Sequence, residues 1–123
     1  MEHHLHDGNG KVGRTQALFR EVNERIVEVV LGASGSDDRL EIVCECASED
    51  CTEPIAISAE EYDAVRRIPT RFVVRPGHVV PEAERVVGSP GGYTVVEKFG
   101  DAGTAAVRLD PRRRKLAAPI AAG

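Results

Sequence analysis

The chain has 123 residues, enough for one domain with a single modest hydrophobic core. It contains two Tyr, three Phe and no Trp, so that core must be mainly aliphatic, and a small aliphatic core gains from an added cross-link such as a bound metal. The 16 basic and 20 acidic residues give a net charge of −4, which offers no overall attraction to nucleic acid or anionic lipid.

No segment approaches the roughly 18 apolar residues of a membrane span, and the N-terminus lacks the apolar core of a signal peptide. We therefore expect a cytoplasmic protein that does not contact membranes. The charge is uneven, because residues 99–123 hold five basic and two acidic residues, a net charge of plus three. The first 98 residues are correspondingly acidic.

Residues 1–13 contain three glycines and three histidines with few apolar side chains, which predicts a flexible N-terminus. The histidines His3, His4 and His6 resemble an adventitious metal-binding tract, and we assign them no function. A single domain is expected over residues 14–98.

An amphipathic helix is predicted from Thr15, a plausible N-cap, to Gly32. Its apolar face would consist of Leu18, Phe19, Val22, Ile26, Val29 and Val30. Its opposite, solvent-facing side would carry Arg20, Glu21, Glu24, Arg25 and Glu28. The turn-rich residues 33–38 would then link this helix to the rest of the domain.

Residues 40–46 alternate like a strand, so Cys44 and Cys46 should point to the same side, with Glu45 on the other. The chain then turns over residues 48–53 and continues in a short strand at residues 55–57. These two strands begin a small, mostly antiparallel sheet.

Ser58 and Glu61 form a capping-box pattern that should start a short helix, which stops before Pro69. Residues 71–74 read as a strand, and residues 85–87 and 93–97 as a hairpin. Beyond Phe99 the Gly, Ala and Pro content predicts a flexible basic tail, residues 99–123. The expected class is α+β: a long N-terminal helix, a small sheet and one short helix, stapled by a metal site.

All three cysteines, Cys44, Cys46 and Cys51, lie within eight residues. Clustered intracellular cysteines favour a metal over a disulfide framework, and structural zinc takes four ligands. His78, in a turn-like Arg-Pro-Gly-His segment, is our candidate for the fourth, giving one structural zinc per chain in a Cys3His site. Glu49, Asp50 or a histidine of a partner molecule could replace it.

Two other interpretations of the cysteines stay open. They could be buried thiols that act as small hydrophobic side chains, or they could form a redox dithiol. The redox interpretation is disfavoured by nearby acidic residues, which would raise the thiol pKa values: Glu45, Glu49, Asp50 and Glu53.

Two groups of basic residues could contact an anion. Residues 112–115 read Arg-Arg-Arg-Lys but have no interleaved aromatics, which is more typical of a solvated tail. Arg66, Arg67, Arg71 and Arg75 flank the proposed histidine, but carboxylates such as Glu60, Glu61 and Asp63 offer ion pairs instead.

Several short motifs together resemble a family of small uncharacterised actinobacterial proteins over about residues 19–98. The motifs are Leu18–Ile26, Cys44-Glu45-Cys46 with Cys51, Glu61-Tyr62, Val65-Arg66, Pro69, Phe72–Val74, Pro76-Gly77-His78 and Val95–Lys98. The resemblance implies one constellation of Cys44, Cys46, Cys51 and His78, and it implies no activity. The family pattern has an aromatic before the first cysteine and an acidic residue after the histidine, where this chain has Ile42-Val43 and Val79.

No phosphate-binding loop, serine-nucleophile motif or paired-histidine helix is present, so catalysis would have to depend on the metal site alone. We expect a non-enzymatic zinc-binding interaction module whose partner is a protein or a nucleic acid, with a protein favoured. A homodimer through the N-terminal helix is one form of that expectation. The alternative is a zinc hydrolase or thiol-redox protein that uses an open metal site or the cysteines.

Overall fold

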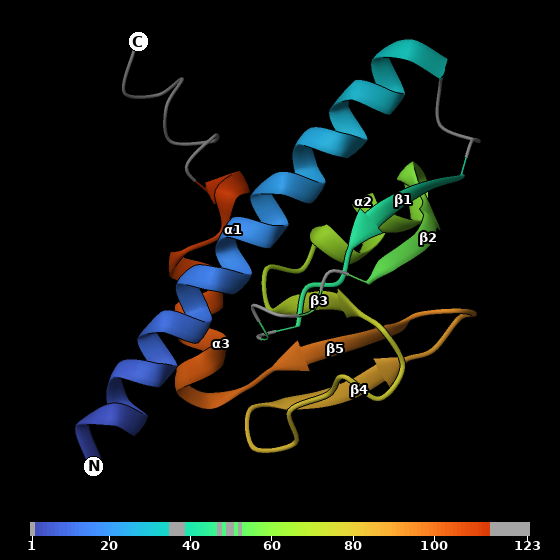
Figure 1. Ribbon diagram of the computed structural model, residues 1–123. Helices are drawn as coiled ribbons and strands as arrows, with labels where there is room; N and C mark the ends of the chain where they lie inside the picture. Colours follow the sequence, from blue (N-terminus) through green and yellow to red (C-terminus); the bar gives the residue numbers. More distant parts are fainter. Residues whose placement is uncertain (1, 35–38, 47, 49–50, 52, 114–123) are drawn as a thin grey trace, which may run out of the picture.

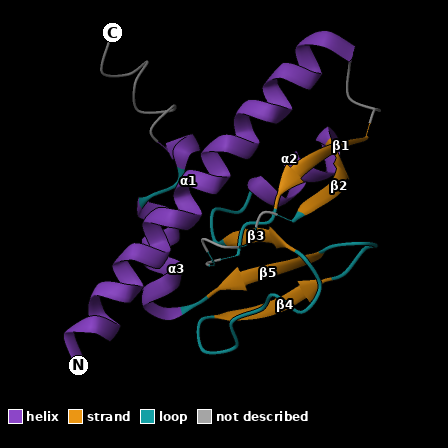
Figure 2. Cartoon of the chain, in the orientation of Figure 1, coloured by secondary structure: helices purple, strands orange, loops and turns teal. Residues whose placement is uncertain are grey.

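The computed structural model describes residues 2–34, 39–46, 48, 51 and 53–113, with side chains described from Gly13 to Gly32 in the first helix. One long helix crosses a body of short strands, and two shorter helices pack beside it (Figures 1 and 2). The elements are α1 Glu2–Ser34, β1 Arg39–Val43, β2 Pro54–Ser58, α2 Ala59–Arg66, β3 Arg71–Val74, β4 Glu84–Gly88, β5 Thr94–Lys98 and α3 Gly100–Arg108.

The strands confirm the predicted α+β class but form two antiparallel sheets, where we expected one. β1 pairs with β2, with Leu40 opposite Ile57, and the second sheet has the order β3-β5-β4. The predicted hairpin is confirmed as β4 and β5, with a bulge after Val86. The sheets meet where the Glu45 amide donates to the Val73 carbonyl at 2.9 Å, just after β1.

The core is mainly aliphatic, as the composition predicts. Its buried aromatic residues are Tyr62, Phe72 and Tyr93. Ser58 caps α2 as expected: its hydroxyl accepts from the Glu61 amide at 3.0 Å, and the Glu61 carboxylate accepts from the Ser58 amide at 2.9 Å. The capping box is therefore complete. Within the described part of the chain, no helix is both long enough and apolar enough to cross a membrane.

The orientation predicted for the first helix is wrong. The helix begins at Glu2, so Thr15 lies inside it and is not its N-cap. Its buried side chains are those of Gln16, Arg20, Asn23, Glu24 and Val27, four of them polar. From the predicted apolar face, Leu18, Val22 and Val29 are 57, 40 and 70% exposed, while Phe19, Ile26 and Val30 are only partly buried.

The inversion has a physical cause. The surface against which α1 packs is rich in polar groups. Hydrophobic periodicity cannot detect these hydrogen-bond partners, because only the tertiary structure brings them to the helix. Arg20 donates to the Pro69 carbonyl at 2.7 Å and stacks on the Phe72 ring, 4.0 Å from its centroid. Glu24 accepts from Arg66 and Arg112. The face of α1 that packs is thus the one with Arg20, Asn23 and Glu24, and Ile26 and Val30 pack against the core while partly exposed.

The expectation of an unpacked tail from residue 99 is wrong for residues 100–113. α3 packs against α1 and β5 (Figure 1), and Asp110 beyond it is buried. A Cβ at Gly103 would lie 3.0 Å from the Lys98 carbonyl oxygen, so a glycine permits this close approach of α3 to β5. The composition signalled flexibility because it is poor in large apolar residues. Residues 114–123 lie outside the described part.

Candidate metal centre

The three cysteines approach one another because the chain turns back after β1. Cys44 and Cys46 continue the β1 alternation onto one side, and the Cys44 amide donates to the Glu53 carbonyl at 3.2 Å. The Cys51 amide donates to the Ser48 carbonyl at 3.2 Å, within the turn that returns the third thiol. All three cysteines are buried.

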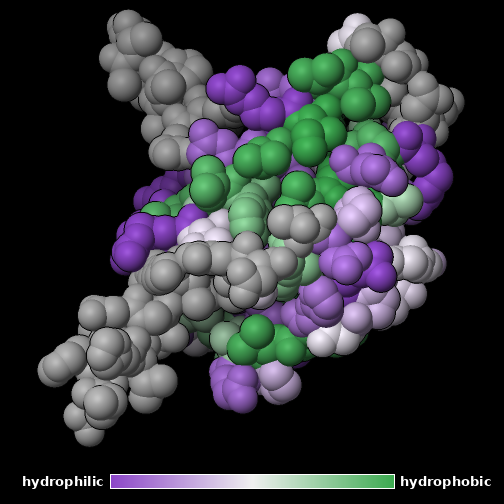
Figure 3. All heavy atoms as spheres, viewed as in Figure 1, coloured by the Kyte–Doolittle hydropathy of each residue, from purple (hydrophilic) through white to green (hydrophobic). Residues whose placement is uncertain are grey.

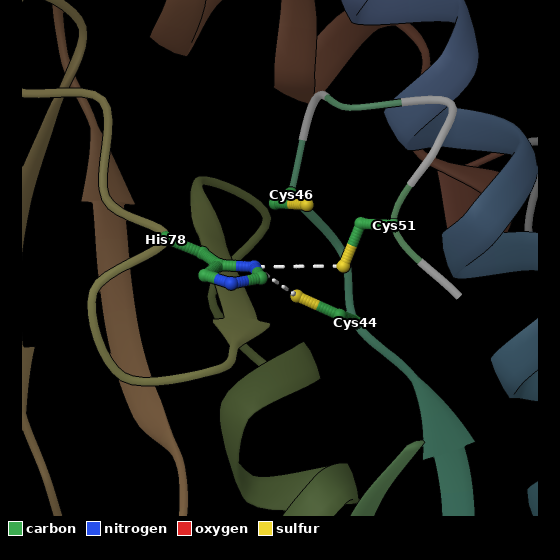
Figure 4. Close-up of side chains that lie close together, drawn as sticks. All are labelled: Cys44, Cys46, Cys51 and His78. Carbon is green, nitrogen blue, oxygen red and sulfur yellow. Dashed lines mark hydrogen bonds between the residues drawn. The ribbon is translucent and has the colours of Figure 1, made fainter. Parts of the chain in front are cut away.

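His78 reaches the cysteines from the loop between β3 and β4. Its amide donates to the Arg75 carbonyl at 3.0 Å, which closes the Arg-Pro-Gly-His turn predicted from the sequence. Gly77 adopts φ 87°, a left-handed conformation that only glycine adopts without strain. The turn directs the imidazole at the thiols (Figure 4).

The four side chains form one compact group of donors. His78 Nδ1 lies 3.5 Å from both the Cys44 and the Cys51 sulfur, and all four ligand atoms lie within 4.8 Å of one another (Figure 4). A tetrahedral zinc with Zn–S of about 2.3 Å and Zn–N of about 2.0 Å would separate sulfur from nitrogen by about 3.5 Å. The two sulfur–nitrogen distances therefore match a tetrahedral metal site.

The local environment keeps the thiols of Cys44 and Cys46 protonated in the absence of a metal. Burial raises the pKa of Cys44 to about 12, although hydrogen bonds from backbone amides, including that of Arg75 at 3.2 Å, act to lower it. Burial likewise raises the pKa of Cys46. The direction agrees with the sequence argument, but its main cause is burial rather than nearby acidic residues. Such thiols are poor nucleophiles, which disfavours the redox interpretation.

Glu45 is a site residue whose position was predicted but whose role was missed. Its side chain points away from the sulfurs, as strand alternation requires, but it is fully buried. The carboxylate accepts from Tyr62 OH, from Asn23 Nδ2 at 2.9 Å and from the Val73 amide at 3.0 Å. An acidic residue between two cysteines could have indicated that the side of the strand opposite the sulfurs is also buried. Its hydrogen-bond partners could not be predicted, because they lie on three other elements.

The arginines flanking the histidine are paired with acceptors, as the ion-pair interpretation predicted, but mostly with other partners. Arg66 is buried against Glu24 and Asp110. Arg67 forms an exposed pair with Asp63, and Arg71 forms a partly buried pair with Glu97. Arg75 donates to the Pro54 carbonyl near Glu53.

Three sets of predicted candidates cannot be placed. Glu49 and Asp50, the substitute ligands, lie outside the described residues, as do Arg114 and Lys115 of the basic run. The side chains of His3, His4 and His6 are also outside the described part. In the described part of the basic run, Arg112 forms ion pairs with Glu24 and Asp63, where a solvated tail was expected.

No protein-family model, curated protein or solved structure matches this chain. The resemblance to actinobacterial proteins has no support from these comparisons and stays a prediction. The site must therefore be interpreted from its own geometry and chemistry.

Proposed function

We propose that this protein is a small zinc-binding module in which Cys44, Cys46, Cys51 and His78 hold one structural zinc ion. The observation that supports this most directly is the convergence of four ligand atoms within 4.8 Å, brought from three separate parts of the chain. Thiolates with one imidazole are a donor set typical of zinc, which is most often tetrahedral in structural sites.

A structural role follows from the number of protein ligands. Four side chains complete a tetrahedral shell and leave no position for water or substrate, whereas a catalytic zinc keeps one position open. The metal would tie the end of β1 to the Cys51 turn and to the His78 loop. Because these segments meet only in the folded chain, metal binding would add directly to the free energy of folding.

The proposal is tested by measuring metal content and the ligand set. We expect one zinc per chain, an X-ray absorption spectrum with three sulfurs and one nitrogen, and a lower melting temperature after chelation. The His78→Ala variant should lose the nitrogen ligand, while the control Ser48→Ala keeps it, since the described contacts of Ser48 with this turn are made by its backbone. An equally stable protein without metal would refute the proposal, and a solvent oxygen at the metal would favour the hydrolase alternative.

We further propose that the module binds a protein through the outer side of α1. Leu18, Val22 and Val29 are exposed along this helix, and apolar side chains gather along it in Figure 3. Contiguous exposed apolar surface is characteristic of protein contacts, while the arginines on β3 and β4 that could bind phosphate are paired with Glu97.

A second copy of the chain is the partner to test first, since an apolar stripe is complementary to itself across a two-fold axis. Sedimentation should then give a dimer that Val22→Asp converts to a monomer. The control Arg25→Ala, also on an exposed position of α1, should stay dimeric. A wild-type chain that remains monomeric at high concentration would exclude self-association through this stripe.

A further inference from the structure

We propose that α1 clamps the metal-binding segment, with Asn23 and Glu45 as positioning residues of the metal site. The inference rests on the proposed metal-binding function and adds to it a coupling between metal occupancy and the docking of α1. It concerns the face of the Cys44-Glu45-Cys46 segment that points away from the sulfurs.

Asn23 of α1 holds the backbone directly before the first cysteine. Its Nδ2 donates to the Val43 carbonyl at 2.8 Å, and its Oδ1 accepts from the Val43 amide at 2.8 Å. The side-chain amide therefore pairs with Val43 on both backbone groups, as a neighbouring strand would. Asn23 is fully buried, so loss of its side chain would leave Val43 without these partners.

Glu45 fixes the residue between the two cysteines from three directions. The same Asn23 Nδ2 donates to its Oε2 at 2.9 Å, Tyr62 of α2 donates to that oxygen, and the Val73 amide of β3 donates to Oε1 at 3.0 Å. Its backbone carbonyl accepts from Gln16 Nε2 at 3.0 Å. Two side chains of α1 thus hold Glu45 at its carboxylate and at its carbonyl.

The two faces of this segment cannot move independently. Cys44 and Cys46 place their sulfurs on the metal side, and the intervening Glu45 places its carboxylate on the α1 side. A shift of the backbone that releases one face displaces the other, because all three residues share consecutive peptide planes. Linkage then requires that the metal tightens α1 docking by the same factor by which α1 tightens metal binding.

The other contacts of α1 with the rest of the protein are mostly polar, which makes its docking sensitive to this coupling. Val27 is the only buried apolar residue among the described side chains of α1, and Ile26 and Val30 pack against the core while partly exposed. The other buried positions, Gln16, Arg20, Asn23 and Glu24, hold α1 through hydrogen bonds and ion pairs. Contacts of this kind depend on partner geometry far more than apolar burial does. Gln16 and Asn23 make theirs with residues 43–45, so the order of those residues bears directly on the docking of α1.

The first experiment compares zinc affinity in the full-length chain, measured by competition with a chromophoric chelator. We expect Asn23→Ala to weaken binding about 10- to 100-fold, the effect typical of removing an outer-shell partner. The control Arg25→Ala, at an exposed position of the same helix, should stay within about twofold of wild type. A purely structural role of Asn23 would lower stability equally with and without zinc and leave the affinity of the folded protein unchanged.

Glu45→Gln provides a second variant that keeps the shape of the side chain. We expect its Co²⁺ form to show an altered visible spectrum relative to wild-type Co²⁺ protein, because the positions of Cys44 and Cys46 would shift. The wild-type chain supplies a measurement that needs no variant: removal of zinc should speed hydrogen exchange at the α1 amides of residues 16–27.

The outcomes separate this inference from the proposed function. A wild-type chain that binds no metal overturns both. A chain that binds zinc normally, with Asn23→Ala affinity and α1 exchange unaffected, overturns the clamp and leaves the metal site standing. Weakened binding in Asn23→Ala together with zinc-dependent protection of α1 would support the clamp.

Discussion

The buried ion network beneath α1 can be tested with two adjacent arginines at the C-terminal end of α2, Arg66 and its C-cap Arg67. Arg66 has a fully buried side chain that contacts Glu24, at 2.8 Å, and Asp110. Arg67 follows it in the chain, is 74% exposed and pairs with Asp63 at 3.3 Å. Both are arginine–carboxylate pairs, so burial is the main difference between them.

Replacing Arg66 with Met removes the cation but leaves two buried carboxylates behind. Breaking a buried pair in this way costs about 3–5 kcal/mol, because the remaining charge is uncompensated. We expect a value of about 3 kcal/mol, at the lower end, because Glu24 retains Arg112 at 2.6 Å and Asp110 retains Arg20 at 3.6 Å. The exposed Arg67→Met should cost at most about 0.5 kcal/mol.

Urea unfolding followed by circular dichroism measures both free energies. Adding Asp110→Asn to Arg66→Met should cost less than the two single changes summed, since the second change removes the charge that the first left unpaired. A loss below about 1 kcal/mol for Arg66→Met would refute the reasoning, because Arg66 would then not be compensating buried charge.

Two further predictions concern α2 and the acid stability of the network. Ser58→Ala, which removes the cap acceptor for the Glu61 amide, should lower the free energy of unfolding by about 1 kcal/mol. Ser89→Ala, at an exposed loop position where the hydroxyl lies 3.4 Å from that of Thr94, should lower it less. Burial alone would raise the pKa of Asp110, but its bond to Arg66 and the charges of Arg66 and Arg20 hold that pKa below its ordinary value. The depressed pKa stabilises the fold above the unfolded value of about 3.9, and this contribution is lost as pH falls through the folded value. The acid-induced loss of stability should therefore be smaller in Asp110→Asn, and an unchanged pH profile would contradict the assignment.

Local sequence signals predicted the elements that depend on neighbours along the chain. The Ser58 and Glu61 pattern specified a helix start because both partners of the capping box lie three residues apart. The alternation through Cys44 and Cys46 specified a shared side for the thiols, and the Pro-Gly turn placed His78. The candidate metal centre was accessible to prediction because its four residues are of a rare, recognisable type.

The docking of α1 could not be predicted in the same way. Its periodicity placed Leu18 and Val22 inward, yet the side with Arg20 and Asn23 is buried. A polar side chain can be buried when the folded chain provides hydrogen-bond partners for it. The partners of Arg20 and Asn23 lie 20 to 86 positions away in the sequence and include the Val43 and Ala106 carbonyls. Hydrophobic patterning treats every buried polar group as if it had no hydrogen-bond partner. For α1 it therefore predicts the wrong face to be buried.

The buried polar layer and the metal centre meet at Glu45. A buried carboxylate costs free energy unless several donors satisfy it, and here the donors come from α1, α2 and β3. The same residue separates two thiols that are buried with raised pKa values when no metal is present. Zinc would convert those thiols to ligands on one side while the three donors hold the carboxylate on the other. A short Cys-Glu-Cys segment thereby joins the candidate metal centre to a helix on which Leu18, Val22 and Val29 remain exposed.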